Sequence, residues 1–178
     1  TLGTGAQSTI NMGSLTIASG ATYSATSGTT TITGDDGGEA YKNNGNADPT
    51  ISFVHNNGLL QFSQTAASSA GYFNILNASS AGTHTFYDLK INAGSSSAHH
   101  SYFHRDIKVL NKFTKVGVRN FANTGGSVAK TLTVHGLSKL ENGILGDAST
   151  TGTYAFLGGL DITGGTLQIG SSHTIQAS

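Results

Sequence analysis

One short phrase recurs along this chain and restricts its fold more than any other feature. Two aliphatic residues stand two positions apart, small polar residues flank them, and a glycine follows. The phrase occurs at residues 14–20, 88–94, 131–136, 159–164 and 166–170. Alternation with a period of two places the aliphatic residues on one face of a β-strand and the polar residues on the other. The chain is therefore predicted to form short strands, each with one buried face.

The repetition also separates the possible β architectures. Short strands joined by Gly, Ser and Asn turns fit a sandwich, a barrel or a β-solenoid. A solenoid reuses one phrase because each turn stacks similar side chains, whereas every strand of a sandwich has its own environment. The single proline agrees with this, since stacked strands use their backbone N–H groups. We predict a right-handed parallel β-helix (β-solenoid) with irregular turns, and a β-sandwich or jelly roll is the alternative.

The predicted core consists of the aliphatic residues of the repeated phrase. We expect ten of them to point into one continuous apolar interior: Leu15, Ile17, Leu89, Ile91, Leu132, Val134, Leu160, Ile162, Leu167 and Ile169. Residues 1–178 are expected to form a single β-rich repeat module. Because the chain lacks a starting Met and ends within a repeat phrase, we also expect it to be a fragment of a longer protein.

Three segments that contain the phrase resemble known repeats. The segments at 13–17, 85–92 and 159–167 look like the degenerate repeats of bacterial surface adhesins, and they are equally similar to repeats of bacteriophage fibre and appendage proteins. In those families a run of the type F-Y-x-L-x-I-N lies on one turn of a right-handed parallel β-helix. The resemblance implies a structural or adhesive role and transfers no catalytic residue to this chain.

The composition excludes several kinds of chemistry. The chain has no cysteine, so disulfides, cysteine-ligated metals and thiol catalysis are absent. No run of about 20 apolar residues is present, so no membrane span is expected. Neither a Gly-x-Ser-x-Gly elbow nor a phosphate-binding glycine loop occurs. We therefore expect a protein that is not an enzyme and that uses no cofactor.

Two clusters of polar residues are candidates for metal or catalytic sites. The acidic cluster contains Asp35, Asp36 and Glu39 within a glycine-rich segment, which fits either a calcium or catalytic loop or a solvated turn. The histidine cluster contains His99, His100 and His104, which fits either a metal site or an exposed loop. The turn and the loop are the favoured interpretations, and no metal site is predicted.

The cationic residues are concentrated in one part of the sequence. Eight of the nine Lys and Arg residues and one of the nine acids lie between positions 90 and 139, so this segment carries +7 and the remainder −7. Such a segment fits an interface with another subunit, a polyanion site with aromatic platforms, or a solvated face. The candidate interface or polyanion-binding residues are Arg105, Lys108, Lys112, Lys115, Arg119, His99, His100 and His104.

Together these features predict a non-enzymatic structural or adhesive module of a virion appendage or an extracellular surface filament. The alternative is a polysaccharide depolymerase or glycan-binding β-helix, which would need two acids about 5–10 Å apart in a groove. The expected partners are further copies of the chain, other structural subunits or a cell-surface glycan, and nucleic acid is not expected. The predicted structural or adhesive role also leads us to expect an extracellular, cell-surface or virion location.

Overall fold

The alternating segments form strands that stack in parallel into a β-solenoid, as predicted. The computed structural model describes residues 8–34, 39–44, 52–64, 72–77, 82–94, 100–118, 120–123, 129–148, 151–170 and 173–177. All regular elements in these ranges are strands, apart from one helical residue at Ser52. None of the described residues forms a helix that could cross a membrane.

The strands follow one another around three sides of the solenoid, which we call sides A, B and C. Side A contains β3 (Tyr23–Ser24), β6 (Phe53–Val54), the first part of β9 (His84–Ala93), the first part of β11 (Ile107–Val116), β13 (Lys130–Val134), β16 (Gly152–Phe156) and β19 (His173–Ala177). Side B contains β1 (Thr9–Met12), β4 (Thr29–Ile32), β7 (Leu59–Gln64), the second parts of β9 and β11, β14 (Ser138–Leu140) and β17 (Leu160–Ile162). Side C contains β2 (Leu15–Ile17), β5 (Glu39–Asn43), β8 (Tyr72–Asn77), β10 (His100–Phe103), β12 (Asn120–Asn123), β15 (Ile144–Leu145) and β18 (Thr166–Leu167).

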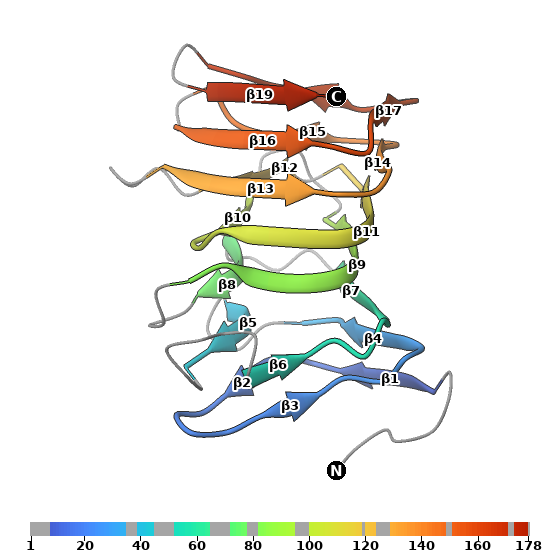
Figure 1. Ribbon diagram of the computed structural model, residues 1–178, viewed down its shortest axis with the longest axis vertical. Helices are drawn as coiled ribbons and strands as arrows, with labels where there is room; N and C mark the ends of the chain where they lie inside the picture. The colour runs from blue at the N-terminus through green and yellow to red at the C-terminus, as the bar shows by residue number, and fades with distance from the viewer. Residues whose placement is uncertain are drawn as a thin grey trace.

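Successive turns rise along the long axis of the molecule. In Figure 1 the chain starts at the bottom and ends at the top, β13, β16 and β19 run across the front, and β12 and β15 run behind them. The front strands point from left to right while the chain climbs, so the coil is right-handed. Every strand pair between turns is parallel, which is the arrangement of a solenoid rather than of a sandwich.

The turns differ in length, as the uneven spacing of the phrase predicts. Tyr23 pairs with Phe53 across one turn, which takes about 30 residues, whereas Tyr154 pairs with Ile175 after about 21. The register of β9 against β11 shifts between Val109 and Lys112, where the ten-stranded sheet turns from side A to side B. Longer turns therefore have more residues between their paired strands than shorter turns do.

Inward-facing side chains stack in columns along the axis. One column on side B runs from the first turn to the last, because each member pairs in register with the next: Met12, Ile32, Phe62, Ile91, Lys115, Leu140 and Ile162. A column on side A is built in the same way from His84, Ile107, Leu132, Tyr154 and Ile175. The columns bury the apolar face of every turn against the turns above and below.

Aromatic rings fill the centre between the three sides. Phe121 of side C lies 5.2 Å from Phe103 and 6.1 Å from Phe113, measured between ring centroids. Lower in the molecule, Phe53 and Phe86 meet in an edge-on contact with centroids 5.4 Å apart. All of these rings except Phe53, which is 4% exposed, are 1% exposed or less. Edge-on and offset ring contacts are favourable, so the interior is densely packed rather than only apolar.

The predicted core is confirmed in most positions and wrong in two. Leu15, Ile17, Leu89, Ile91, Leu132 and Val134 are buried, and Leu160 and Leu167 pack against the core from partly exposed positions. Ile162 and Ile169 are 48% and 52% exposed, so they do not belong to a closed core. Ile162 lies in register above Leu140, and no described strand covers it. The sequence pattern predicts the correct side of its strand for Ile162 but does not predict how much of its side chain a neighbouring turn covers.

Candidate functional site

Four cationic residues of the basic segment lie on sides A and B and at the corner between them. Lys90 and Lys139 face outward on side B, and Lys112 lies at the corner where side A meets side B. Lys108 faces outward on side A, paired with Thr85 and Thr133. These residues occupy the middle turns of the molecule. They therefore lie on two sides of the solenoid and at the corner between these sides.

Lys115 is the residue of this group that the structure places inside. Its side chain is fully buried, and its Nζ donates to the carbonyl oxygens of Val116 at 3.1 Å, Gly117 at 2.8 Å and Asn142 at 3.4 Å. Burial lowers the pKa of Lys115 to about 8, because the ammonium loses its hydration. Lys115 therefore satisfies backbone carbonyls at a corner, and its side chain is not available to an outside partner.

Acids from outside the basic segment lie next to its cations. Asp88 pairs in register with Lys112, and Asp161 pairs in register with Lys139. Glu141 lines the same hollow as Lys90 and Lys112. The separation of charge along the sequence is therefore much weaker in space, because each turn brings residues distant in sequence onto adjacent strands.

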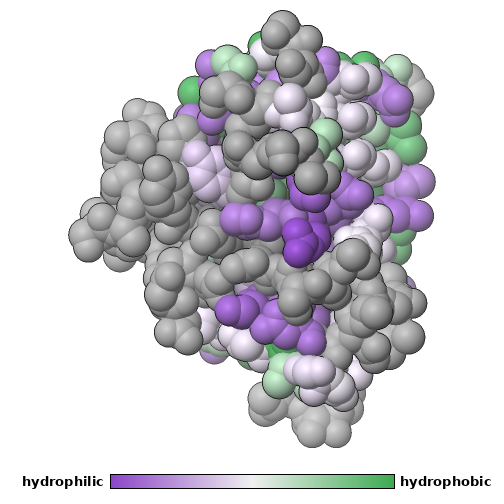
Figure 2. Space-filling view, turned by 90° about the vertical axis from the view of Figure 1, so that its left-hand side faces the viewer, coloured by the Kyte–Doolittle hydropathy of each residue, from purple (hydrophilic) through white to green (hydrophobic). Residues whose placement is uncertain are grey.

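Other predicted residues lie at the corner between side C and side A. Arg105 donates from Nη1 to the carbonyl oxygen of His104 at 2.9 Å, and both residues are partly buried. The face of the molecule that contains this corner shows hydrophilic residues at mid-height (Figure 2). Only the backbone of His100 is described, in β10, and His99 and Arg119 lie outside the described residues. The histidines and Arg119 are thus not shown to form one cluster.

The acidic cluster is also largely outside the described part of the chain. Asp35 and Asp36 are not described, and Glu39 is described only by its backbone at the start of β5. Among the residues that the structure does describe, no group of three or more His, Asp or Glu side chains is arranged to hold a metal ion.

A row of adjoining hollows runs along the corner between sides A and B, and we call it the corner groove. Leu59 and Asp88 lie at its centre and are shared by three adjoining hollows. The upper hollow, about 290 Å³, is also lined by Leu89, Lys90, Lys112, Thr114 and Glu141. The lower hollow, about 390 Å³, is also lined by Thr9, Ser27, Gly28, Thr29 and Asn57.

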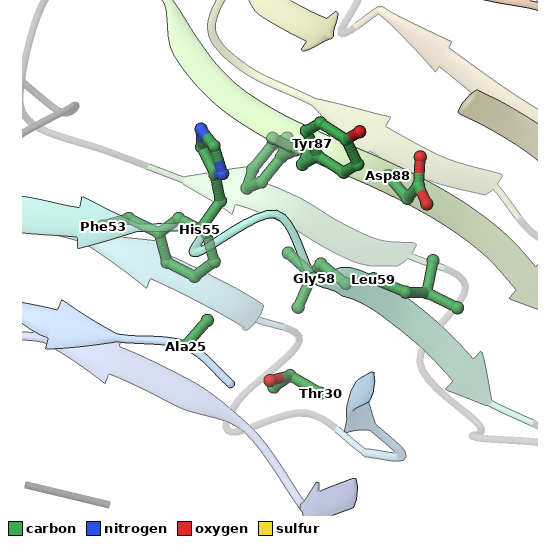
Figure 3. A pocket seen from close by; sticks show the side chains of 10 residues that line it. Ala25, Thr30, Phe53, His55, Gly58, Leu59, Tyr87 and Asp88 are labelled. Atoms are coloured by element: carbon green, nitrogen blue, oxygen red, sulfur yellow. The ribbon is translucent and has the colours of Figure 1, made fainter. Parts of the chain in front are cut away.

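A pair of rings stands at the middle of the corner groove. His55 and Tyr87 stack with centroids 6.0 Å apart and planes inclined by 27°. Figure 3 shows Tyr87 next to Asp88 on β9, with Ala25 and Thr30 on the opposite wall of the pocket. The sequence singles out neither ring, because the ring partner of His55 lies one turn later in the chain.

Local turns hold the groove residues in place. Asn56 and Asn57 adopt the left-handed conformation with φ of 48° and 58°, which Asn tolerates better than most residues. Asn56 Nδ2 donates to the carbonyl oxygen of Ala25 at 2.7 Å, and His55 Nδ1 accepts from the backbone N–H of Asn57 at 3.0 Å. Burial lowers the pKa of His55, so its ring is a neutral platform at neutral pH.

Asp88 is fixed at the centre of the groove by two donors. Its Oδ1 accepts from Asn111 Nδ2 at 2.8 Å and from the backbone N–H of Lys112 at 2.9 Å. Asp88 and Glu141 are the two acids that line the upper hollow. The carboxylate of Asp88 therefore has a structural task at the bend of the sheet, and it retains further acceptor capacity toward the groove.

The arrangement suits binding of an elongated polar molecule. The ring pair lines the narrow middle hollow, and the upper hollow offers two ammonium groups, a hydroxyl and two carboxylates. An aromatic surface next to convergent polar groups is how small polar ligands are oriented in clefts. No protein-family model, curated protein or solved structure matches this chain, so the adhesin and phage resemblance rests on its repeated phrases alone.

Proposed function

We propose that this chain is a non-enzymatic structural module of adhesive type, built into an extracellular surface filament or a virion appendage. One observation carries the proposal: inward columns and parallel ladders continue without interruption from β1 to β17 and from the first part of β9 to β19. Strands stacked about 4.8 Å apart with a packed aromatic interior make a stiff rod. A rod of this kind holds the binding surfaces on its sides at a fixed distance from the filament or virion that carries it.

The outer surface supports the proposed location. Only 10% of the residues are charged and none is cysteine, and the outward positions of the strands carry mainly Thr, Ser, Asn and Gln. Columns such as Thr131, Thr153 and Thr174 place hydroxyl groups in register on side A. An uncharged hydroxyl-rich surface needs no reducing compartment or metal for its stability, and it suits weak contacts that gain strength by repetition.

A second candidate function is glycan binding by the corner groove. The observation that favours it is the stacked pair of His55 and Tyr87 in the middle hollow, which shares Asp88 with the upper hollow that Lys90 and Lys112 line. The apolar face of a sugar ring can pack on the aromatic pair while its hydroxyls bond to the charged groups. In this proposal Asp88 and Glu141 bind hydroxyl groups and do not cleave the chain.

Binding to immobilised polysaccharides, measured with monomeric protein and with the protein tetramerised through a tag, tests both proposals. We expect weak binding by the monomer, binding at least tenfold stronger by the tetramer, and no release of reducing ends. Tyr87→Ala should abolish glycan binding, whereas Tyr102→Ala, which alters an outward tyrosine on side C, should leave it unchanged. Release of reducing ends would overturn the non-enzymatic proposal, and equal binding by the two variants would remove the corner groove from it.

A further inference from the structure

The corner between sides B and C brings an Asn-Gly pair next to a buried ammonium group. Asn142 and Gly143 lie between β14 and β15 at this corner, and Asn142 is exposed to solvent. The backbone N–H of Gly143 donates to Oδ1 of Asn142 at 2.7 Å. The side-chain amide of Asn142 is therefore folded back onto the next backbone nitrogen, which brings together the two groups that can close a five-membered imide ring.

Lys115 lies against the same peptide unit. Its Nζ donates to the carbonyl oxygen of Asn142 at 3.4 Å, and a Cβ added at Gly143 would lie only 2.7 Å from this Nζ. Gly143 also has a φ of 72°, a conformation that favours glycine. When the Gly143 N–H loses its proton, the negative charge is shared between that nitrogen and the Asn142 carbonyl oxygen. The ammonium of Lys115 is therefore placed to stabilise the charge that develops as the ring closes.

A second Asn-Gly pair in the same chain has a different environment. The sequence contains such pairs at 44–45, 57–58 and 142–143, and the first of them extends outside the described residues. Gly58 donates its backbone N–H to the carbonyl oxygen of His55 at 3.0 Å, so this proton is bonded within its own turn. The pair at 57–58 therefore provides an internal comparison for Asn142 and Gly143, with identical chemistry and different geometry.

We propose that Asn142 is a site of spontaneous backbone modification, in which the nitrogen of Gly143 attacks the side-chain amide of Asn142 with the help of Lys115. The bond between this nitrogen and Cγ forms, the bond between Cγ and Nδ2 breaks, and Nδ2 leaves as ammonia with the proton from the Gly143 N–H. Water then opens the cyclic imide to aspartate or to isoaspartate, whose main chain runs through Cγ and is one carbon longer. The inference goes beyond the proposed function, because it concerns the chain itself and no ligand.

The modification changes a contact between two turns of the solenoid. The carbonyl oxygens of Val116 and Gly117 belong to the same turn as Lys115, whereas that of Asn142 comes from the next turn. An extra main-chain carbon at position 142 displaces this third oxygen from the ammonium. The isoaspartate form should therefore melt at a lower temperature than the unmodified protein, whereas Asn142→Asp, which adds the same charge and no carbon, should melt close to the wild type.

Peptide mass spectrometry of the wild-type protein during incubation at neutral pH tests the site without any substitution. Conversion of the amide to the acid should be at least about tenfold faster at Asn142 than at Asn57, which is the effect of one charge-assisted hydrogen bond on the barrier. In urea, which unfolds the protein, both residues become ordinary members of Asn-Gly pairs and should convert at similar rates. A native rate at Asn142 no higher than that at Asn57 would overturn the proposal.

The variant Lys115→Met tests the part assigned to the ammonium. At neutral pH it should slow the conversion of Asn142 at least about tenfold and leave that of Asn57 unchanged. Ring closure needs loss of a proton, so its rate rises with pH. Burial lowers the pKa of Lys115 to about 8, so this rise should become less steep above pH 8 in the wild type and continue unchanged in Lys115→Met.

The surroundings of Lys115 make this comparison specific. Its inward neighbours on the flanking strands, Ile91 and Leu140, are uncharged. The charged groups nearest to it among the described residues are the outward Lys90 and Lys139 on those strands and Glu141 at the corner, and all three are present in both proteins. An equal or faster conversion of Asn142 in Lys115→Met, or the same pH profile in both proteins, would overturn the part assigned to Lys115.

Discussion

Substitution of two residues in the same column separates a closed core from an open one. Leu140 and Ile162 are neighbours in register, yet the first is fully buried and the second is 48% exposed. Truncating Leu140 to Ala removes three carbon atoms from the interior, which costs about 2.4 kcal/mol in transfer free energy at about 0.8 kcal/mol each. The cavity left behind raises the expected loss of unfolding free energy to about 3 kcal/mol. Truncating the half-exposed Ile162 should cost no more than about 1 kcal/mol.

Urea denaturation followed by circular dichroism measures this difference. For a chain of this length, a loss of about 3 kcal/mol lowers the melting temperature by about 6–12 °C. The slope of the unfolding free energy against urea should be the same for wild type and both variants. Equal destabilisation by Leu140→Ala and Ile162→Ala in dilute solution would show that the last turn is covered and that the reasoning is wrong.

Three further predictions concern the buried polar residues and the close-packed corners. Burial and the nearby Arg105 lower the pKa of His84 to about 4, and neither of its ring nitrogens has a hydrogen-bond partner among the described residues. Stability should therefore fall by up to about 3 kcal/mol as the pH drops from 6.5 to 4. Thermal melts should show this loss in the wild type and not in His84→Leu. Because the pKa of Lys115 is lowered to about 8 in the folded state, the unfolding free energy should rise between pH 8 and 10. Denaturation curves measured across this range should show the rise in the wild type and not in Lys115→Met. An added Cβ at Gly136 would collide with the carbonyl oxygen of Asn111, whereas a Cβ at Gly13 would meet open space. Gly136→Ala should therefore lower the unfolding free energy by about 2–3 kcal/mol, and Gly13→Ala should change it by less than about 1 kcal/mol. Equal effects of the two substitutions would contradict the close approach of the turns.

The sequence predicts the strand faces well because alternation is a local property. Leu89 and Ile91 point inward and Lys90 points outward, as a strand with a period of two requires. The repeated phrase also predicts parallel stacking, since similar turns can bury each other's apolar faces. Neither inference needs contacts between distant residues.

The sequence does not predict the environment of the polar residues. Lys115 stands among cations in the sequence and reads as an exposed residue, but it occupies an inward position between Ile91 and Leu140. Its burial is possible because three carbonyl oxygens converge at the corner, one of them from Asn142 a turn later. The corner groove was missed for the same reason, because His55 and Tyr87 stack only after the chain has completed a turn.

By itself, then, the sequence determined the secondary structure, the face that each strand buries and the solenoid class, because these follow from spacing within a few residues. Only the tertiary structure decided which side chains of a column are covered by a neighbouring turn and which are exposed, as Leu140 and Ile162 show. It also decided how charge is distributed, by placing Asp88 beside Lys112 and Asp161 beside Lys139. The physical reason is that the length of each turn sets which residues become neighbours, and loops of uneven length make that register a property of the whole fold.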